Sequence, residues 1–404
     1  MKTSQSNFLR FLVHNWSLLL AMSFGSALAH IATTGMPLQV GALMDGTART
    51  PSQAGLFAFI EVASLSLGMI LLSLLVARIK PLQVAIAGAL LAVLADLGLY
   101  VAREFTLQLV LGGIAGLGFG LAYSATISAG ATSSDTDRAY AVGVGGSLLL
   151  VVLIMTILPF TAAQLGPLGV FACMAGFAFL CTPIFFGFKG TSIQTQTRPH
   201  VARSAVWRSP GTAGLLFSWA AFSTGTAVAY VFAERIGRNI QLTPTVIGLV
   251  LSSGVFVGVL GTTLAGLLSQ LLDRRVALVG GLAGSALACF LIGHATTLTS
   301  FGAGIFLYWI CSMFLYCILL GTAAVLDKTG RLGTLGSGTE RLGYGIGAWI
   351  GGLLAQHVSY TSTGTFGCAT CVAGIIIGYP TLFRALGRRG PGAIKHVLSF
   401  DDGA

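Results

Sequence analysis

The sequence predicts an all-α membrane protein that crosses the bilayer many times. Of its 404 residues, 55% are hydrophobic and only 8% are charged, and the mean hydropathy is +0.87. A soluble domain carries about 25% charged residues, so this composition excludes a water-soluble fold. The apolar runs are continuous and about 20 residues long, as in membrane-spanning helices, and lack the alternation of a membrane β-barrel.

Windows of about 20 residues predict about twelve spans in two groups of six. The first group is expected over 15–37, 53–76, 82–101, 106–129, 140–160 and 167–187. The second group is expected over 211–234, 244–271, 276–296, 301–326, 336–357 and 365–385. The longest polar stretch between spans separates the groups, which predicts an N-terminal bundle (1–188), a linker (189–209), a C-terminal bundle (210–388) and a tail (389–404).

The net charge of +10 reflects topology rather than nucleic-acid binding. With the N-terminus placed in the cytoplasm, 17 of the 22 Lys and Arg residues fall in cytoplasmic loops, in the linker or at the termini. This is the positive-inside distribution, and it predicts a plasma (bacterial inner) membrane protein with both termini in the cytoplasm. The exceptions are four outward arginines and one arginine inside a helix, namely Arg49, Arg103, Arg235, Arg238 and Arg341.

The two halves repeat one another. The pattern TPxxxGL opens the second span at Pro51 and the eighth span at Pro244, 193 residues later. Arg138 and Arg331 follow the fourth and tenth spans at the same separation. Parallel six-span repeats form one transporter architecture, with the substrate site between the halves near the membrane midplane.

These features resemble the major facilitator superfamily, in its bacterial 12-span type, over essentially the whole chain. The resemblance rests on the 6+6 plan, the segment 37–56 (PLQVGALMDGTARTPSQAGL), the glycine-rich segment 112–120 and the Asp327-x-x-x-Arg331 spacing. It implies a monomeric secondary transporter that alternates between inward-open and outward-open states. Spans 1, 4, 7 and 10 would line the cavity, and spans 2, 5, 8 and 11 would form the seam between halves.

Several features depart from the family pattern, among them the absence of the family's arginine from span 4 and a loop after span 8 reduced to Asp273-Arg274-Arg275. The loop after span 2, Ala77 to Pro81, is basic but lacks the family's aspartate. Span 5 lacks the glycine-proline signature of drug/proton antiporters and has only Pro159 near its end. These departures disfavour classical drug/proton antiport.

Three acids, Glu61, Asp96 and Glu340, fall within predicted spans. Glu61 would sit about 12 Å inside an apolar layer about 30 Å thick, where an ionisable group is costly and is by default a functional candidate. On a seam helix by resemblance, it is the leading proton-coupling candidate, although a satisfied structural acid is the alternative. Glu340 is a further candidate, whereas Asp96 is expected to play a structural role.

The candidate substrate contacts are polar and aromatic. Arg341 could clamp a carboxylate with its bidentate fork, or instead extend to lipid phosphate. His30, in the middle of span 1, could hold a proton or contact substrate, or be a buried hydrogen-bonded residue. Tyrosines and tryptophans near span ends could also be interfacial anchors. The remaining cavity candidates are Gln39, Tyr123, Trp219, Tyr230, Tyr308, Trp309, Ser312 and Tyr316.

Gating is expected at the cytoplasmic ends of the fourth and tenth spans, through latches between helices made by Asp135, Arg138, Asp327 and Arg331. No P-loop, GxSxG motif or histidine cluster occurs, so neither an enzyme nor a cofactor or metal site is expected. All seven cysteines lie in apolar runs and are expected to be buried thiols.

The expected function is secondary active transport of a small organic solute, such as an organic or aromatic anion, coupled to protons. Export or uniport of small amphipathic compounds by the same fold is the alternative. A non-transporting membrane sensor or enzyme is the remote alternative.

Overall fold

The computed structural model describes residues 2–75, 80–133, 135–191, 210–268, 271–326, 331–378 and 380, and all regular structure in these ranges is helical. The N-terminal half comprises α1 (Lys2–Thr34), α2 (Met36–Thr47), α3 (Pro51–Leu75), α4 (Pro81–Val101), α5 (Phe105–Gly130), α6 (Thr136–Leu165), α7 (Gly169–Ile184) and the short η2 (Phe185–Phe188). The C-terminal half comprises α8 (Pro210–Tyr230), α9 (Ala233–Asn239), α10 (Pro244–Leu268), α11 (Arg274–Gly293), α12 (Leu298–Leu326), α13 (Arg331–His357), α14 (Tyr360–Ala373) and η3 (Gly374–Gly378).

Each predicted span corresponds to a long helix, so the all-α multi-pass architecture is confirmed. Eleven spans among the described residues are long and apolar enough to cross a membrane. The helix α13 is also long, with 27 residues, but its glycines and the Glu340–Arg341 pair make it less apolar. One prediction was incomplete, because the first span is not continuous but breaks at Gly35 into α1 and α2.

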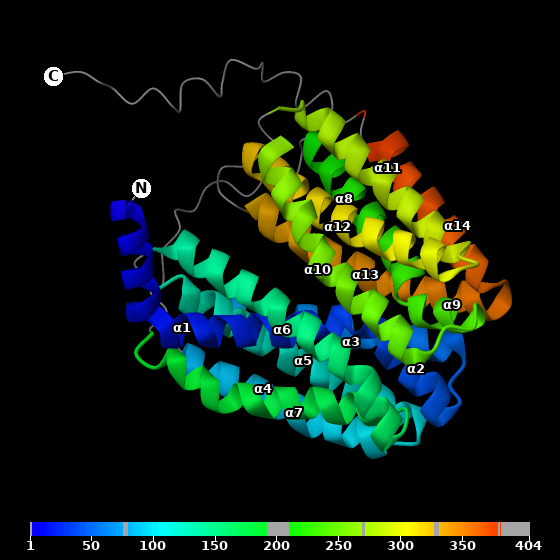
Figure 1. Cartoon of the computed structure of the whole chain (residues 1–404), viewed down its shortest axis with the longest axis horizontal. Helices are drawn as coiled ribbons and strands as arrows, with labels where there is room; N and C mark the ends of the chain where they lie inside the picture. Colours follow the sequence, from blue (N-terminus) through cyan, green and yellow to red (C-terminus); the bar gives the residue numbers. More distant parts are fainter. Residues whose placement is uncertain are drawn as a thin grey trace.

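The two halves meet at one end of the molecule. In Figure 1 they converge where α2 and α9 lie and diverge toward the end where α1 begins. Hydrogen bonds and ion pairs that join described residues of the two halves run from the end of α1, at Thr33, to the α2/α9 end, at Ser52 and Gln356. We call the end where α2 and α9 lie the closed end, and the opposite end, where α1 begins, the open end.

The seam between halves is formed by α3 against α13 and by α6 against α10. These are spans 2, 11, 5 and 8, the set that the family resemblance implies. Glycines allow the backbones to approach closely, because a Cβ on Gly55 would lie only 2.6 Å from the Ala348 carbonyl oxygen. A Cβ on Gly352 would lie 2.5 Å from the Pro51 carbonyl oxygen, so the seam is tightest near the closed end.

Glycines also allow a close contact between α5 and α3 within the N-terminal half. Gly112, Gly116 and Gly120 of α5 lie four residues apart and face α3. A Cβ on Gly116 would overlap the Glu61 carbonyl oxygen, and one on Gly120 would overlap that of Leu65. The glycine-rich segment is therefore a helix-packing surface.

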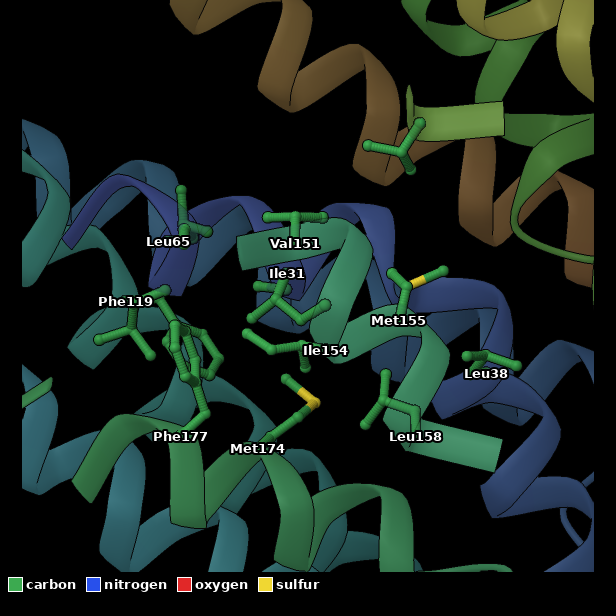
Figure 2. Close-up of a cluster of buried hydrophobic side chains, with 14 of the residues drawn as sticks. Ile31, Leu38, Leu65, Phe119, Val151, Ile154, Met155, Leu158, Met174 and Phe177 are labelled. Atoms are coloured by element: carbon green, nitrogen blue, oxygen red, sulfur yellow. The ribbon is translucent and has the colours of Figure 1, made fainter. Parts of the chain in front are cut away.

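Apolar side chains fill the rest of the N-terminal half. Figure 2 shows Ile31 of α1 and Ile154 of α6 beside Met174 and Phe177 of α7, with Phe119 of α5 at one side. These side chains are at most 7% exposed, so the core packs α5, α6 and α7 against α1.

Gly116→Ala is expected to destabilise the protein by about 1–3 kcal/mol, because overpacking at a tight backbone contact outweighs the gain in helix propensity. Gly113→Ala is the matched control, since its Cβ would make an ordinary 3.4 Å contact with Ser64 Oγ. Thermal unfolding in detergent measures both variants. Equal melting temperatures for the two would contradict this packing account.

Candidate functional site

The break between α1 and α2 releases three backbone carbonyls. Pro37, in the first turn of α2, has no N–H and cannot donate to the Thr33 carbonyl four residues earlier. The N–H of Leu38 donates to Gly35 O instead of to Thr34 O, at 3.0 Å. The carbonyls of Ala32, Thr33 and Thr34 are therefore left for side-chain donors, because a buried carbonyl needs a partner.

Side chains from both halves satisfy these carbonyls. Gln39 Nε2 donates to Ala32 O at 3.0 Å. From the other half, the Tyr344 hydroxyl donates to Thr33 O and the Tyr230 hydroxyl donates to Thr34 O, each at 2.9 Å. The break is therefore a point of hydrogen-bonded attachment between the halves. Three of its donors, Gln39, Tyr230 and Tyr344, come from α2, α8 and α13.

Polar side chains converge beside the break from α1, α5, α12 and α13. Arg341 Nη1 donates to Thr33 Oγ1 at 3.2 Å, and the charge of Arg341 acts on the His30 ring. The His30 ring centroid lies 5.6 Å from that of Tyr123. His30, Tyr123 and Arg341 are half-buried, and no described residue forms an ion pair with Arg341. We call this group the central polar cluster, and it comprises His30, Tyr123, Tyr316, Glu340 and Arg341.

Two aromatic groups flank the central polar cluster. Tyr230 stacks on Tyr308 with ring centroids 4.4 Å apart, and Trp309 meets both rings edge-on. On the side of the open end, Trp219 packs its ring on Gly336 and lies edge-on to Tyr316 at 6.1 Å. Within the described residues, Trp219 Nε1, Trp309 Nε1 and Ser312 Oγ are buried and have no hydrogen-bond partner. The structure thus brings most of the predicted cavity residues to one place.

Glu61 lies outside the central polar cluster. The resemblance implied a place for Glu61 on a seam helix, but α3 presents Ala54, Ala58 and Val62 to that seam. Glu61 is 1% exposed, and its backbone contacts Gly116 inside the N-terminal half. The reason is helical geometry, because neighbouring residues point about 100° apart and Val62 takes the seam-facing position.

A charged network that sequence reasoning missed joins α2 to α9 at the closed end. Asp45 accepts from Arg235 Nη1 at 2.8 Å and lies 3.5 Å from Arg238 Nη2. Glu234 lies 2.8 Å from Arg235 Nε and 3.0 Å from Arg238 Nε. Arg235 also donates to the Gly41 carbonyl at 2.6 Å. The sequence contained a sign of this network, because Arg235 and Arg238 are two of the four arginines that the positive-inside pattern leaves on the outer side.

Of the four predicted latch residues, the structure describes the side chains of Asp135 and Arg138. Asp135 caps the first turn of α6 and pairs with Arg138 of the same helix at 3.0 Å, so this pair is local rather than between helices. Asp327 lies outside the described residues, and Arg331 begins α13 without a described side chain.

Comparisons with known proteins identify the fold. Scans against protein-family models and curated proteins find no match. The structure is similar to a nucleoside transporter, NupG, with TM-score 0.69, 9% identity and coverage of 92% of this chain and 99% of that chain. It is also similar to a bacterial homologue of the human lysosomal transporter Spinster in an inward-facing, unoccupied conformation, with TM-score 0.70, 13% identity and coverage of 92% and 96%. The chain therefore has the major facilitator fold that the sequence predicted.

Tyr344→Phe and Tyr230→Phe are each expected to lower stability by about 1–3 kcal/mol, because each leaves a buried carbonyl of the break without a donor. Tyr308→Phe is the matched control: it stacks on Tyr230, but its hydroxyl makes no hydrogen bond to a described residue. Thermal unfolding in detergent gives the comparison. A loss in the control as large as in the other two variants would show that the cost does not come from the unpaired carbonyls of the break.

The ion pairs that Asp45 forms with Arg235 and Arg238 are expected to weaken only at acidic pH. Partial burial raises the pKa of Asp45, but the Arg235 hydrogen bond and the charges of Arg235 and Arg238 outweigh burial and lower the pKa below its ordinary value. Since the folded-state pKa is depressed, the stabilisation is present above the unfolded value of about 3.9 and is lost as pH falls through the lower value.

The measurement is the stability difference between the wild type and Asp45→Asn as a function of pH. It should stay constant, at about 0.2–1 kcal/mol for a partly exposed pair, from neutral pH to about pH 5. A difference that disappears above about pH 5 would contradict the assigned pairing.

Proposed function

We propose that this protein is a secondary transporter that moves a small organic anion across the bacterial inner membrane by alternating access. The observation that carries the proposal is Arg341, a half-buried arginine without a carboxylate partner among the described residues, placed where helices of both halves converge. The two transporters of similar fold support this class of function.

The chemistry of the central polar cluster favours an anionic group on the solute. A guanidinium binds a carboxylate through two parallel hydrogen bonds, and charge-assisted bonds of this kind are strong at a partly desolvated site. His30, Tyr123 and Tyr316 add ring and hydroxyl groups within electrostatic reach of Arg341 or of one another. The aromatic groups on either side suit an apolar or aromatic body, as in an aromatic acid.

The arrangement of the halves supports an inward-open state. The closed end carries the four arginines that the positive-inside pattern places outside, so this end would face away from the cytoplasm. Two of them, Arg49 and Arg103, tie the outer loops together: Arg49 Nε donates to Gln108 Oε1 at 2.8 Å, and Arg103 Nη1 donates to Gly46 O at 3.4 Å. The open end would then admit solute from the cytoplasm.

Transport is proposed to be driven by protons, with Glu61 as the leading carrier. Its carboxyl group is buried and neither oxygen has a hydrogen-bond partner among the described residues. His30 and Glu340, in the central polar cluster, are the other candidates. Two alternatives would use the same central site: uniport of the anion without proton coupling, and export of the anion from the cell.

Arg341→Lys is expected to weaken binding of organic anions by about 10- to 100-fold, because a charged hydrogen bond contributes about 1.5–3 kcal/mol and lysine lacks the planar fork. Ligand-induced thermal stabilisation across carboxylates and their neutral amides measures the effect. Arg238→Lys, at the closed end, is the control and should leave ligand affinity unchanged. Equal stabilisation of the wild type by acids and amides would contradict the anion assignment.

Glu61→Gln is expected to abolish gradient-driven accumulation of solute while retaining exchange, since a carrier that cannot release a proton can still reorient with substrate. Proteoliposome uptake under a pH gradient and counterflow without one are the paired assays. Glu104→Gln, an exposed acid at the start of α5, is the control. Undiminished accumulation by Glu61→Gln would exclude Glu61 as the coupling residue.

A further inference from the structure

A cavity of about 210 Å³ lies at the closed end, and no residue of the central polar cluster lines it. Its lining comes from both halves, since α2, α6 and α7 of the N-terminal half contribute to it together with α9 and α10 of the C-terminal half. The volume equals that of about seven water molecules at about 30 Å³ each, so the cavity can hold a small organic molecule. We call it the closed-end cavity.

The closed-end cavity has an exposed rim and a buried, apolar floor. Among its lining residues, Asp45, Arg238 and Ala163 are exposed, so the cavity reaches the surface of the molecule. Pro159 of α6 and Val170 of α7 are buried and form part of the floor. This combination suits a ligand with an apolar body and a polar group.

The charged lining is acidic on balance. It consists of the carboxylates of Asp45 and Glu234 and the guanidinium of Arg238. Asp45 and Arg238 are exposed, so water can satisfy the hydrogen-bonding groups that their ion pair leaves free. Glu234 is only 5% exposed, so its carboxylate depends on partners within the protein or on a ligand.

The Glu234 carboxylate has acceptor capacity to spare. Its Oε1 accepts from Arg238 Nε at 3.0 Å. Its Oε2 lies 2.8 Å from Arg235 Nε in an ion pair, but neither atom has a hydrogen-bond partner in the described part of the chain, so the two are not aligned for a hydrogen bond. A carboxylate offers about four lone-pair sites, so this one can accept from a further donor.

The underused oxygen lies at the wall of the cavity. Gly41 lines the cavity, and a Cβ at this position would lie 2.6 Å from Glu234 Oε2. The missing side chain of Gly41 therefore gives this oxygen its room. A charge-assisted hydrogen bond to a carboxylate that is shielded from water is among the strong ones.

We propose that the closed-end cavity binds a small organic cation, with a primary ammonium group on a compact apolar body. The ammonium donates to the carboxylates of Glu234 and Asp45, and the apolar body lies on the floor beside Pro159. A carboxylate ligand in the same place would meet these two like charges, which disfavours it. The site is therefore distinct in place and in charge preference from the anion site at Arg341.

An occupant of this cavity contacts both halves, since Asp45 and Pro159 belong to one half and Glu234 belongs to the other. A ligand shifts an equilibrium toward the state that it binds better, so the cation favours the state in which this end is closed. Inhibition of transport from the outer side rests on the proposed function, whereas binding itself does not.

Thermal unfolding of the full-length protein in detergent, with three probes that share one ring, tests the site. The probes are benzylamine, which is protonated at neutral pH, benzyl alcohol and benzoate. Benzylamine should stabilise the wild type more than benzyl alcohol does, by an amount that grows with its concentration. Glu234→Gln should weaken benzylamine binding by about 10- to 100-fold, the effect of losing one charge-assisted hydrogen bond. The control Glu104→Gln should leave it unchanged.

A second variant tests the place of binding without changing a charge. Ala163→Trp puts a large ring at the exposed rim and should also abolish the stabilisation by benzylamine, and it decides if Glu234→Gln fails to fold. Arg341→Lys should leave the effect of benzylamine unchanged while weakening that of benzoate, so failure of this proposal and failure of the anion assignment give different results.

Four results would overturn the proposal. The first is the absence of any stabilisation of the wild type by benzylamine, and the second is equal stabilisation by benzylamine and benzyl alcohol. The third is full retention of the benzylamine effect in either Glu234→Gln or Ala163→Trp. The fourth is its loss in Arg341→Lys, which would assign the amine to the central polar cluster.

Discussion

The missing N–H of Pro37 is the constraint from which the arrangement at the centre of this protein follows. A continuous helix would consume the carbonyls of Ala32, Thr33 and Thr34 internally, and none would be available to the opposite half. The break at Gly35 releases them in an apolar layer, where an unsatisfied carbonyl costs several kcal/mol. The hydroxyls of Tyr230 and Tyr344 then bind both halves to one short segment.

The break lies between two sites with different chemistry. On one side is the central polar cluster, where Arg341 donates to Thr33 and where we propose that the solute binds. On the other side is the closed-end cavity, to which α2 contributes Leu38, Gly41 and Asp45. The break and the short helix that follows it thus connect the proposed solute and cation sites, which gives coupling between them a physical route without a long chain of contacts.

Hydropathy predicted the spans, and the family resemblance implied the seam helices that the structure shows. Sequence reasoning placed Arg341 and His30 as candidates, and the structure brings them together. It could not orient Glu61, since the face of α3 that meets α13 is fixed by tertiary packing of Ala58 and its neighbours. It also took the segment around Pro37 as the end of a span, because proline alone does not distinguish the end of a helix from a break within one.

The most direct test is a distance measurement on Pro37→Ala, which restores the N–H that the Thr33 carbonyl lacks. Spin labels at the exposed positions Thr50 and Val358 report the separation of the halves at the closed end. The wild type should show one short distance, and Pro37→Ala should add a longer population because Tyr344 loses its acceptor. Identical distance distributions in the two proteins would contradict the account.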